Sequence, residues 1–127
     1  MEAAIWGRAV LAELLIYQGN YFALRKMNQQ AGASYAAAIE KDPDNMRSYM
    51  VAAGFYEMTG NNEKALALYT TALDRQPDDI RIKSTIASFY LKNKNLDQAG
   101  STIDGILQER PYYFPARLLK GELLVQN

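Results

Sequence analysis

Cysteine and histidine are both absent from this sequence of 127 residues. Without cysteine the chain forms no disulfide and offers no thiolate, and redox usage does not indicate a compartment. Without histidine it lacks the commonest metal ligand and the commonest general base. Lysine and arginine together number 14, as do aspartate and glutamate, so the formal net charge is zero. A neutral chain is not expected to bind nucleic acid through bulk electrostatic attraction.

Long uncharged runs are also missing. The apolar segment 3–17 is interrupted by Arg8 and Glu13, and it lacks the basic start and cleavage site of a signal peptide. No uncharged stretch reaches the ~18 residues that suggest a membrane span. We therefore expect no direct membrane insertion. Segment 3–17 is interpreted as part of one long helix that caps the N-terminal end of the fold and runs into the first repeat.

Motifs that carry chemistry are scarce. The sequence has no phosphate-binding loop, metal-ligand cluster or nucleophile elbow. Ser84, Ser88 and Ser101 have no histidine to activate them. The acidic residues beside Pro43 and Pro77 suit helix capping and solvated surfaces better than catalysis. The sequence therefore predicts a chain that is not an enzyme and that uses no cofactor and no metal.

An internal repeat is the strongest pattern present. Pro43, Pro77 and Pro111 lie 34 residues apart, and five further series recur in the same register. The series are Ala31, Ala65 and Ala99; Ala38, Ala72 and Ile106; Tyr35, Tyr69 and Ile103; Phe22, Tyr56, Tyr90 and Leu124; and Gly19, Ala53, Ala87 and Gly121. Internal duplication explains series that share one register, and a period of this length is typical of helical-repeat proteins.

Each repeat has the pattern of a helical hairpin. In the second repeat, Tyr49 and Tyr56 keep helical spacing, residues 60–62 (Gly-Asn-Asn) form a turn signal, and helical spacing resumes from Ala65. The short acidic side chains of Asp78 and Asp79 can cap the helix that follows. A single hairpin is too small to bury its apolar face, so neighbouring hairpins must stack.

These residues resemble the tetratricopeptide repeat family, most clearly over residues 49–79 and, with fewer matches, from Ala12 to the end of the chain. The resemblance implies an all-α fold, a right-handed superhelical stack of antiparallel helix pairs (a TPR-like α-solenoid) with seven or eight helices and no strand. The sequence departs from the family where Lys26 and Lys94 replace the turn glycine. The ending "ARLLKGELLVQN" is similar in style to bacterial arrays.

The resemblance divides a single domain, residues 1–127, into an N-terminal cap (1–11), three repeats (12–45, 46–79 and 80–113) and a half-repeat or capping helix (114–127). Asn127 falls where the last helix would turn into a partner helix, which favours a chain cut from a longer array; the alternative is a natural C-terminal cap. A cut array predicts self-association through the C-terminal helix, by apolar residues among Leu118, Leu119, Leu123, Leu124 and Val125.

In this family, ligands usually dock on the concave face that the first helices of the hairpins line, so the resemblance implies a protein or peptide partner. The candidate peptide-binding residues on that face are Tyr17, Asn20, Arg47, Met50, Val51, Met58, Arg81, Ser84, Ser88 and Lys92. An apolar strip is expected from Ile16, Tyr17, Met50, Val51 and Met58, and a positive end from Arg81, Lys83, Lys92 and Lys94. The combination suits a segment with an apolar stretch followed by acidic residues.

Alternatives stay open for each feature. The apolar strip could instead be covered by the N-terminal helix folded back as a plug, or form the inner packing of a tighter superhelix. The basic helix could be a solvated face. The aromatic cluster of Tyr112, Tyr113 and Phe114 is expected to pack between the third hairpin and the last helix, with a contact to another protein as the alternative.

Two functions known within the family do not fit these residues. The clamp that holds chaperone tails needs lysine, asparagine and arginine where this chain has Ile16, Val51 and Thr85, and only Asn20 and Arg81 match. The asparagine ladder of the sugar-transferase arrays is also absent. We therefore predict a non-catalytic protein-interaction module. The alternative is an assembly or scaffold segment of a larger protein, of a bacterial envelope, secretion or pilus-assembly type, acting through its ends or convex face.

Overall fold

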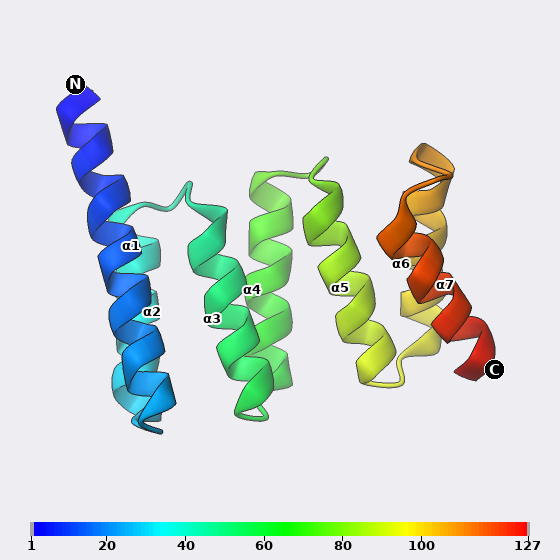
Figure 1. Ribbon diagram of the computed structural model, residues 1–127, viewed down its shortest axis with the longest axis horizontal. Coiled ribbons are helices and arrows are strands. Elements are labelled where there is room, and N and C mark those ends of the chain that lie inside the picture. Colours follow the sequence, from blue (N-terminus) through cyan, green and yellow to red (C-terminus); the bar gives the residue numbers. More distant parts are fainter. Residues whose placement is uncertain (1, 127) are drawn as a thin grey trace. The chain divides into compact units, whose positions relative to one another are not determined.

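The chain is entirely helical in the part that the structure describes. A computed structural model describes the backbone of residues 2–126 and the side chains of residues 6–126, and this part holds seven α-helices and no strand (Figure 1). The helices are α1 (Glu2–Leu24), α2 (Asn28–Lys41), α3 (Met46–Met58), α4 (Asn62–Arg75), α5 (Ile80–Lys92), α6 (Leu96–Glu109) and α7 (Phe114–Gln126). The predicted all-α array of helix pairs is confirmed. Asn127, on which the expectation of a cut array depended, lies outside the described residues.

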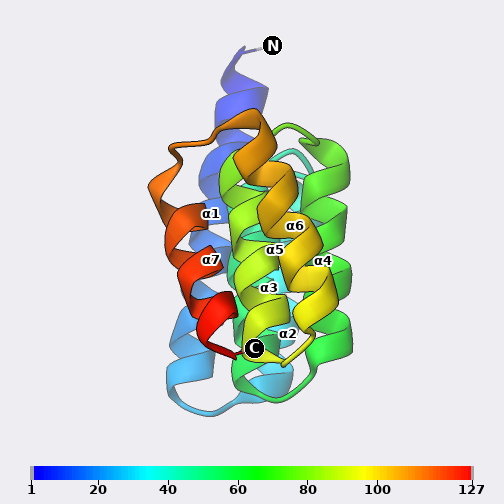
Figure 2. The same cartoon turned by 90° about the vertical axis from the view of Figure 1, so that its right-hand side faces the viewer.

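The helices form two compact units, Met1–Arg75 and Gln76–Asn127, which are treated separately below. In the first unit α1 pairs with α2 and α3 pairs with α4, while α3 also contacts α1 and α2. In the second unit α5 pairs with α6, and α7 lies alongside both (Figure 2). The helices α3, α5 and α7 begin at Met46, Ile80 and Phe114, the residues at which the repeats are expected to begin.

The N-terminal helix α1 is continuous over 23 residues, whereas its partner α2 has 14. The segment before the first repeat therefore runs straight into that repeat, as predicted. Because this segment is part of α1, it does not fold back over the apolar strip, and the alternative of an N-terminal plug is wrong.

The helices α1, α3 and α5 end in the same backbone motif. The residue after each helix's last turn has a positive φ, at Lys26 (58°), Gly60 (86°) and Lys94 (62°). The next residue donates its N–H to a carbonyl five positions back, at 2.8–2.9 Å, in the pairs Met27–Phe22, Asn61–Tyr56 and Asn95–Tyr90. This is the Schellman arrangement of a helix end. The missing turn glycines therefore do not change the turn shape, although two lysines adopt a conformation that glycine reaches without steric cost.

Two helix starts are capped by side chains, and the sequence predicts one of these caps. The Asp79 carboxylate accepts hydrogen bonds from the backbone N–H of Arg81 (2.9 Å) and Ile82 (3.3 Å), which confirms its predicted capping role at α5. The Asn45 side chain accepts from the N–H of Arg47 at 3.0 Å and caps α3. These caps satisfy backbone donors that have no partner within the helix.

Each unit has its own apolar core. In the first unit the core includes Ala31, Tyr35, Ala52 and Phe55, with the two rings 5.3 Å apart. In the second unit it consists of Ala87, Leu91, Ala99, Ile103 and Leu123. The recurring alanines allow close helix approach: Ala65 and Ala99 are both 0% exposed.

Candidate functional site

A groove of about 420 Å³ lies between α1 and α3 in the first unit. Its lining comes from three helices and consists of Asn20, Ala23, Leu24, Tyr35, Val51, Gly54, Phe55 and Met58. We call this the α1–α3 groove. It forms because α1 and α3 are both first helices of their hairpins and meet over α2, with small residues (Ala23 and Gly54) where larger side chains would fill the space.

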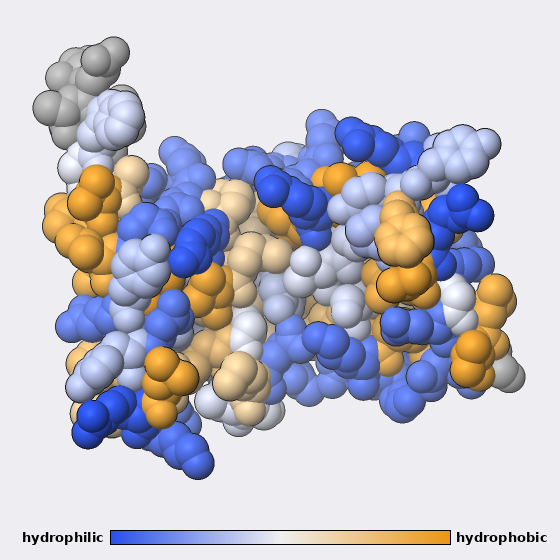
Figure 3. All heavy atoms as spheres, viewed as in Figure 1, coloured by the Kyte–Doolittle hydropathy of each residue, from blue (hydrophilic) through white to orange (hydrophobic). Residues whose placement is uncertain are grey.

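The walls of the α1–α3 groove carry unusually exposed apolar side chains. Leu24 and Met58 are each 86% exposed, one on each wall. Figure 3 shows apolar side chains gathered along α1 and between α1 and α3. A methionine adapts its shape to varied ligand side chains. Apolar side chains left in water beside a hollow are typical of a surface that another molecule covers.

One polar group of the lining is positioned by the core. The Tyr35 hydroxyl donates a hydrogen bond of 2.6 Å to Asn20 Oδ1. Burial raises the pKa of Tyr35 above its ordinary value, so the hydroxyl keeps its proton and remains a donor. This bond occupies the Asn20 oxygen and leaves its amide NH₂ to donate. The groove therefore combines apolar walls with a fixed donor that suits a peptide carbonyl.

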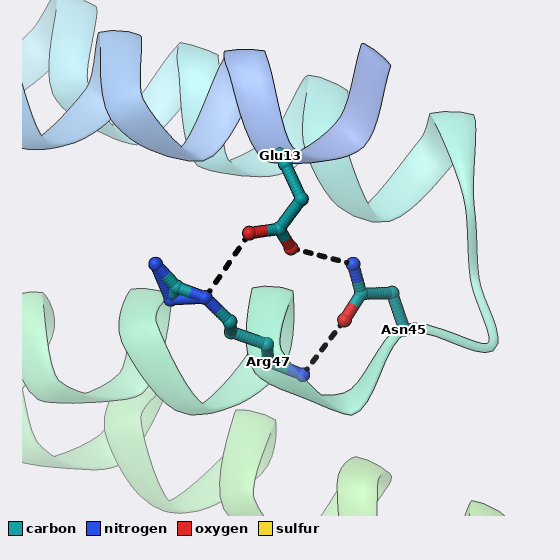
Figure 4. Close-up of polar contacts among 3 residues, drawn as sticks. All are labelled: Glu13, Asn45 and Arg47. Atoms are coloured by element: carbon teal, nitrogen blue, oxygen red, sulfur yellow. Dashed lines mark hydrogen bonds and ion pairs between the residues drawn. The ribbon is translucent and has the colours of Figure 1, made fainter. Parts of the chain in front are cut away.

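A polar cluster joins α1 to α3 beside the groove (Figure 4). The Glu13 carboxylate accepts two hydrogen bonds, one on each oxygen. Arg47 Nε donates at 3.2 Å and Asn45 Nδ2 donates at 3.0 Å. The Arg47 guanidinium also lies 5.8 Å from the centre of the Tyr17 ring. Arg47 is therefore compensated by Glu13 and positions Tyr17, rather than presenting an unpaired positive charge.

The structure brings together most of the residues predicted for the first two repeats. Asn20, Val51 and Met58 line the α1–α3 groove, and Tyr17 and Arg47 form its polar border. Met50 lies on α3, partly buried, outside the groove lining.

One member of the predicted apolar strip is misplaced. Ile16 is 0% exposed, so its assignment to the strip is wrong. The reason is its position on α1: with Ala12 and Gly19, spaced by four and three residues, it forms the face that packs into the unit. The sequence analysis did not predict that Ala23 lines the groove. The one sequence feature that could have indicated it is its spacing of one helical turn from Asn20.

The remaining predicted site residues, Arg81, Ser84, Ser88 and Lys92, lie on α5 in the second unit. Arg81 is exposed, with Nε 3.8 Å from Asp79 Oδ1, and the two serines are partly buried. Lys83 pairs with Glu109 at 3.4 Å, and Lys94 Nζ donates to Gln126 at 2.8 Å. Arg81, Lys83 and Lys94, which belong to the predicted positive end, thus have polar partners inside this unit.

The aromatic cluster before α7 does not pack as expected. Tyr112 is 85% exposed and Phe114 is 68% exposed, while Tyr113 is partly buried. The Arg117 guanidinium lies 6.0 Å from the centre of the Tyr112 ring. The expectation that these rings pack between the third hairpin and the last helix is therefore wrong for Tyr112 and Phe114. Leu119 and Leu123 of α7 fill that space instead.

A second cleft in the first unit was not foreseen. It measures about 630 Å³ and opens between α2, α3 and α4, where the absence of a side chain at Gly32 allows the close approach of the Tyr56 hydroxyl. Lys64 Nζ lies 4.7 Å from the centre of the Tyr56 ring at this cleft. No group of three or more acidic side chains that could hold a metal ion occurs among the described residues.

The comparisons with known proteins agree on the class. The sequence model of the tetratricopeptide repeat matches residues 23–89 and 59–112, well over half of the chain. The chain therefore belongs to the tetratricopeptide repeat family, whose members are generally interaction modules. No curated protein sequence matches the chain.

Solved structures share the fold. The Arabidopsis OM64 TPR domain is 16% identical with a TM-score of 0.72, over 94% of this chain and 99% of that one. A tetratricopeptide repeat protein from Parabacteroides merdae is 27% identical with a TM-score of 0.74, over 88% of this chain and 44% of that one. The first TPR of Spaghetti (RPAP3), bound to the HSP90 peptide SRMEEVD, is 18% identical with a TM-score of 0.70, over 93% and 94%.

Proposed function

We propose that this chain is a non-catalytic protein-interaction module whose first unit holds a segment of a partner in the α1–α3 groove. The observation that carries the proposal is a groove of about 420 Å³ with two strongly exposed apolar side chains in its walls. Leu24 and Met58 are each 86% exposed. Apolar anchors placed in such a pocket supply most of the binding energy of an interface. The RPAP3 domain, which shares the fold, was solved with a peptide bound.

The groove chemistry defines the partner segment. Val51, Leu24 and Met58 suit one or two large apolar side chains, and the Asn20 amide suits a backbone carbonyl beside them. The positions that would clamp a terminal carboxylate are unsuited to it, because Ile16 is buried and Val51 is apolar. The expected ligand is therefore an internal apolar segment, extended or helical, rather than a chaperone-type tail.

We also propose the α5 residues Arg81, Ser84, Ser88 and Lys92 as a contact surface of the second unit, for acidic residues of a partner. Exposed charges of this kind steer association more than they add affinity. Reversing Arg81 and Lys92 to glutamate should slow association and weaken its salt dependence. Tyr17→Ala or Met58→Ala should mainly speed dissociation, because these variants remove apolar contact at the border and in the lining of the groove. Unchanged rates for all four variants would show that the ligand uses another surface.

The direct test of the groove uses two glycines. Gly54 lines the groove and Gly105 lies exposed on α6, and an added Cβ would meet no atom within 4 Å at either. Peptides should be selected from a displayed random library, and their dissociation constants measured for Gly54→Phe and, as the matched control, Gly105→Phe. We expect Gly54→Phe alone to abolish binding, because its ring fills the groove. The peptide SRMEEVD should bind neither the parent nor the variants.

Selected peptides that bind Gly54→Phe as well as they bind the parent protein would refute the groove. Tight binding of SRMEEVD would refute the exclusion of terminal carboxylates.

A second candidate is an assembly or scaffold role through the C-terminal helix, favoured by the apolar residues that α7 leaves in water. Leu118 is 53%, Leu124 63% and Val125 86% exposed, whereas Leu123 is buried in the core. Self-association through α7 predicts a sedimentation coefficient that rises with concentration and a return to monomer in Leu118→Glu. A chain whose association is unchanged in Leu118→Glu would contradict it.

A further inference from the structure

The helix α1 carries a second apolar face that stays mostly exposed, although α3 approaches it at Tyr17 and Leu24. Its inward face is formed by Ala12, Ile16 and Gly19. The outward face holds six large side chains that are 55–86% exposed: Trp6, Val10, Leu14, Tyr17, Tyr21 and Leu24. We call these six residues the α1 stripe. A helix that is apolar on opposite faces is normally covered on both.

The spacing of the α1 stripe indicates what covers it. From Val10 to Leu24 its residues are separated by four, three, four and three positions. This alternation is the heptad pattern that keeps an apolar seam against another helix. The cover is therefore a helix lying along α1 rather than a loop or a sheet edge.

A lipid cover is disfavoured by the charges of α1. No helix within the described residues combines the length and the apolar character that a membrane crossing requires. A helix that lies on a membrane surface usually has a polar face rich in lysine and arginine. The charged side chains described on α1 are Arg8 and Glu13, and Glu13 is engaged by Arg47 and Asn45. A protein helix is the better fit.

We propose that the cover is α1 of a second copy of this chain, packed antiparallel to form a two-fold dimer. We place the two-fold axis midway between Leu14 and Tyr17, at the centre of the α1 stripe. In this register Leu14 faces Tyr17 of the second copy, Val10 faces Tyr21, and Gly7 faces Leu24. Each layer then sets a small side chain against a large one, which is how facing positions fill space evenly. A parallel pair would set glycine against glycine and tyrosine against tyrosine, leaving one end hollow and the other crowded.

The ends of the antiparallel pair are also complementary. The same register sets Trp6 opposite Arg25 of the second copy, and a guanidinium over an indole is a favourable pairing. The Arg25 guanidinium already lies 5.8 Å from the centre of the Tyr21 ring, beside the α1 stripe. Antiparallel packing also places opposite ends of the helix dipoles together.

The area suffices for a stable dimer. Six large side chains at 55–86% exposure present on the order of 800 Å², about what one partner contributes to a standard interface. Two-fold symmetry doubles every contact, because each residue pair occurs twice.

Sedimentation velocity at rising concentration tests the dimer. We expect the parent chain to dimerise and Leu14→Glu to raise the dimer dissociation constant by about a hundredfold or more, because two carboxylates would be buried against tyrosines. Leu14 is 57% exposed, so the monomer should keep its circular dichroism and its unfolding midpoint. Tyr21→Glu should behave the same way. Gln30→Glu on α2 is the charge-matched control, and Leu118→Glu is the control for association through α7; both should dimerise like the parent.

Cysteine cross-linking tests the orientation, and the natural absence of cysteine makes it clean. In the antiparallel register Val10→Cys meets Tyr21→Cys of the other copy, while two copies of Val10→Cys are roughly 16 Å apart along the axis. Oxidation should therefore cross-link an equimolar mixture of the two variants and neither variant alone. Cross-linking of Val10→Cys by itself would establish a parallel pair and overturn the register.

Three further results would overturn the dimer itself. One is a parent chain that stays monomeric at every concentration. Another is a Leu14→Glu chain that still dimerises while Leu118→Glu does not. The third is a monomeric parent that floats with vesicles of mixed neutral and anionic lipid while Leu14→Glu does not, because this would assign the α1 stripe to a membrane surface.

Discussion

Gly19 should be the glycine of α1 that cannot be replaced. A methyl group added at Gly19 would lie 2.5 Å from Cε1, 2.7 Å from Cδ1 and 2.9 Å from Cζ of the Tyr35 ring. That ring cannot easily move, because Tyr35 is 2% exposed, its centroid is 5.3 Å from that of Phe55, and its hydroxyl is bonded to Asn20 at 2.6 Å. Gly19→Ala must therefore displace a core side chain or separate α1 from α2.

The change in the free energy of unfolding caused by Gly19→Ala is the sum of one stabilising and two destabilising contributions. Replacing a helical glycine by alanine normally stabilises by about 1 kcal/mol. Overpacking a buried site costs about 1–3 kcal/mol, and weakening the Tyr35–Asn20 bond adds about 1 kcal/mol. We expect a net loss of about 1–3 kcal/mol. With a urea m-value of about 2 kcal/mol/M, the unfolding midpoint should fall by roughly 0.5–1.5 M.

Urea titration followed by circular dichroism measures this effect, with two controls. Gly7→Ala lies on the same helix and Gly121→Ala occupies the same repeat position on α7, and an added Cβ meets no atom within 4 Å at either. Both controls should raise the midpoint or leave it unchanged. Tyr35→Leu should absorb part of the Gly19→Ala loss in the double variant, because contacting sites are not additive. A midpoint for Gly19→Ala as high as that of Gly7→Ala would refute the reasoning.

Four other substitutions should change the free energy of unfolding measured in the same way. Lys26→Gly should stabilise by about 0.5–1 kcal/mol, because relief of the positive φ outweighs the added freedom of the unfolded chain; a lower midpoint would contradict this. Ser48→Ala should stabilise by about 1 kcal/mol, since Ser48 is 0% exposed and its hydroxyl has no hydrogen-bond partner within the described residues; a loss of stability would reveal a missing partner. Ala65→Leu and Ala99→Leu should each destabilise by about 1–3 kcal/mol, and unchanged midpoints for both would show that these positions are not close helix contacts.

The helix boundaries were predictable because they depend on local signals. Asp79 caps α5 by accepting hydrogen bonds from the N–H groups two and three residues ahead, and the turn after α3 contains a glycine with positive φ. The same turn forms at Lys26 and Lys94, because two backbone hydrogen bonds stabilise it whatever the side chain. Capping residues and turns that recur every 34 residues can therefore be recognised in the sequence and predict the helix boundaries.

The exposed faces were less predictable because they depend on neighbours. The helix α1 is apolar all round, so its sequence has no periodicity that tells the buried Ile16 from the exposed Tyr17. Likewise Lys83 and Lys94 look like free cations in sequence, and their partners Glu109 and Gln126 are 26 and 32 residues away. Such pairings follow from tertiary packing, which local patterns do not encode.

Leu24 belongs to both the α1–α3 groove and the α1 stripe, and Tyr17 of the stripe borders the groove, so a partner segment and a second copy should compete for the first unit. If only a tenth of the chain is monomeric, the apparent dissociation constant of a groove peptide rises about tenfold. Linkage requires the converse, that saturating peptide dissociates the dimer by the same free energy. Peptide titrations at increasing protein concentration should therefore show falling affinity for the parent and constant, tighter affinity for Leu14→Glu. Equal affinity for both proteins at all concentrations would show that the two surfaces act independently, because nothing but the shared side chains connects them.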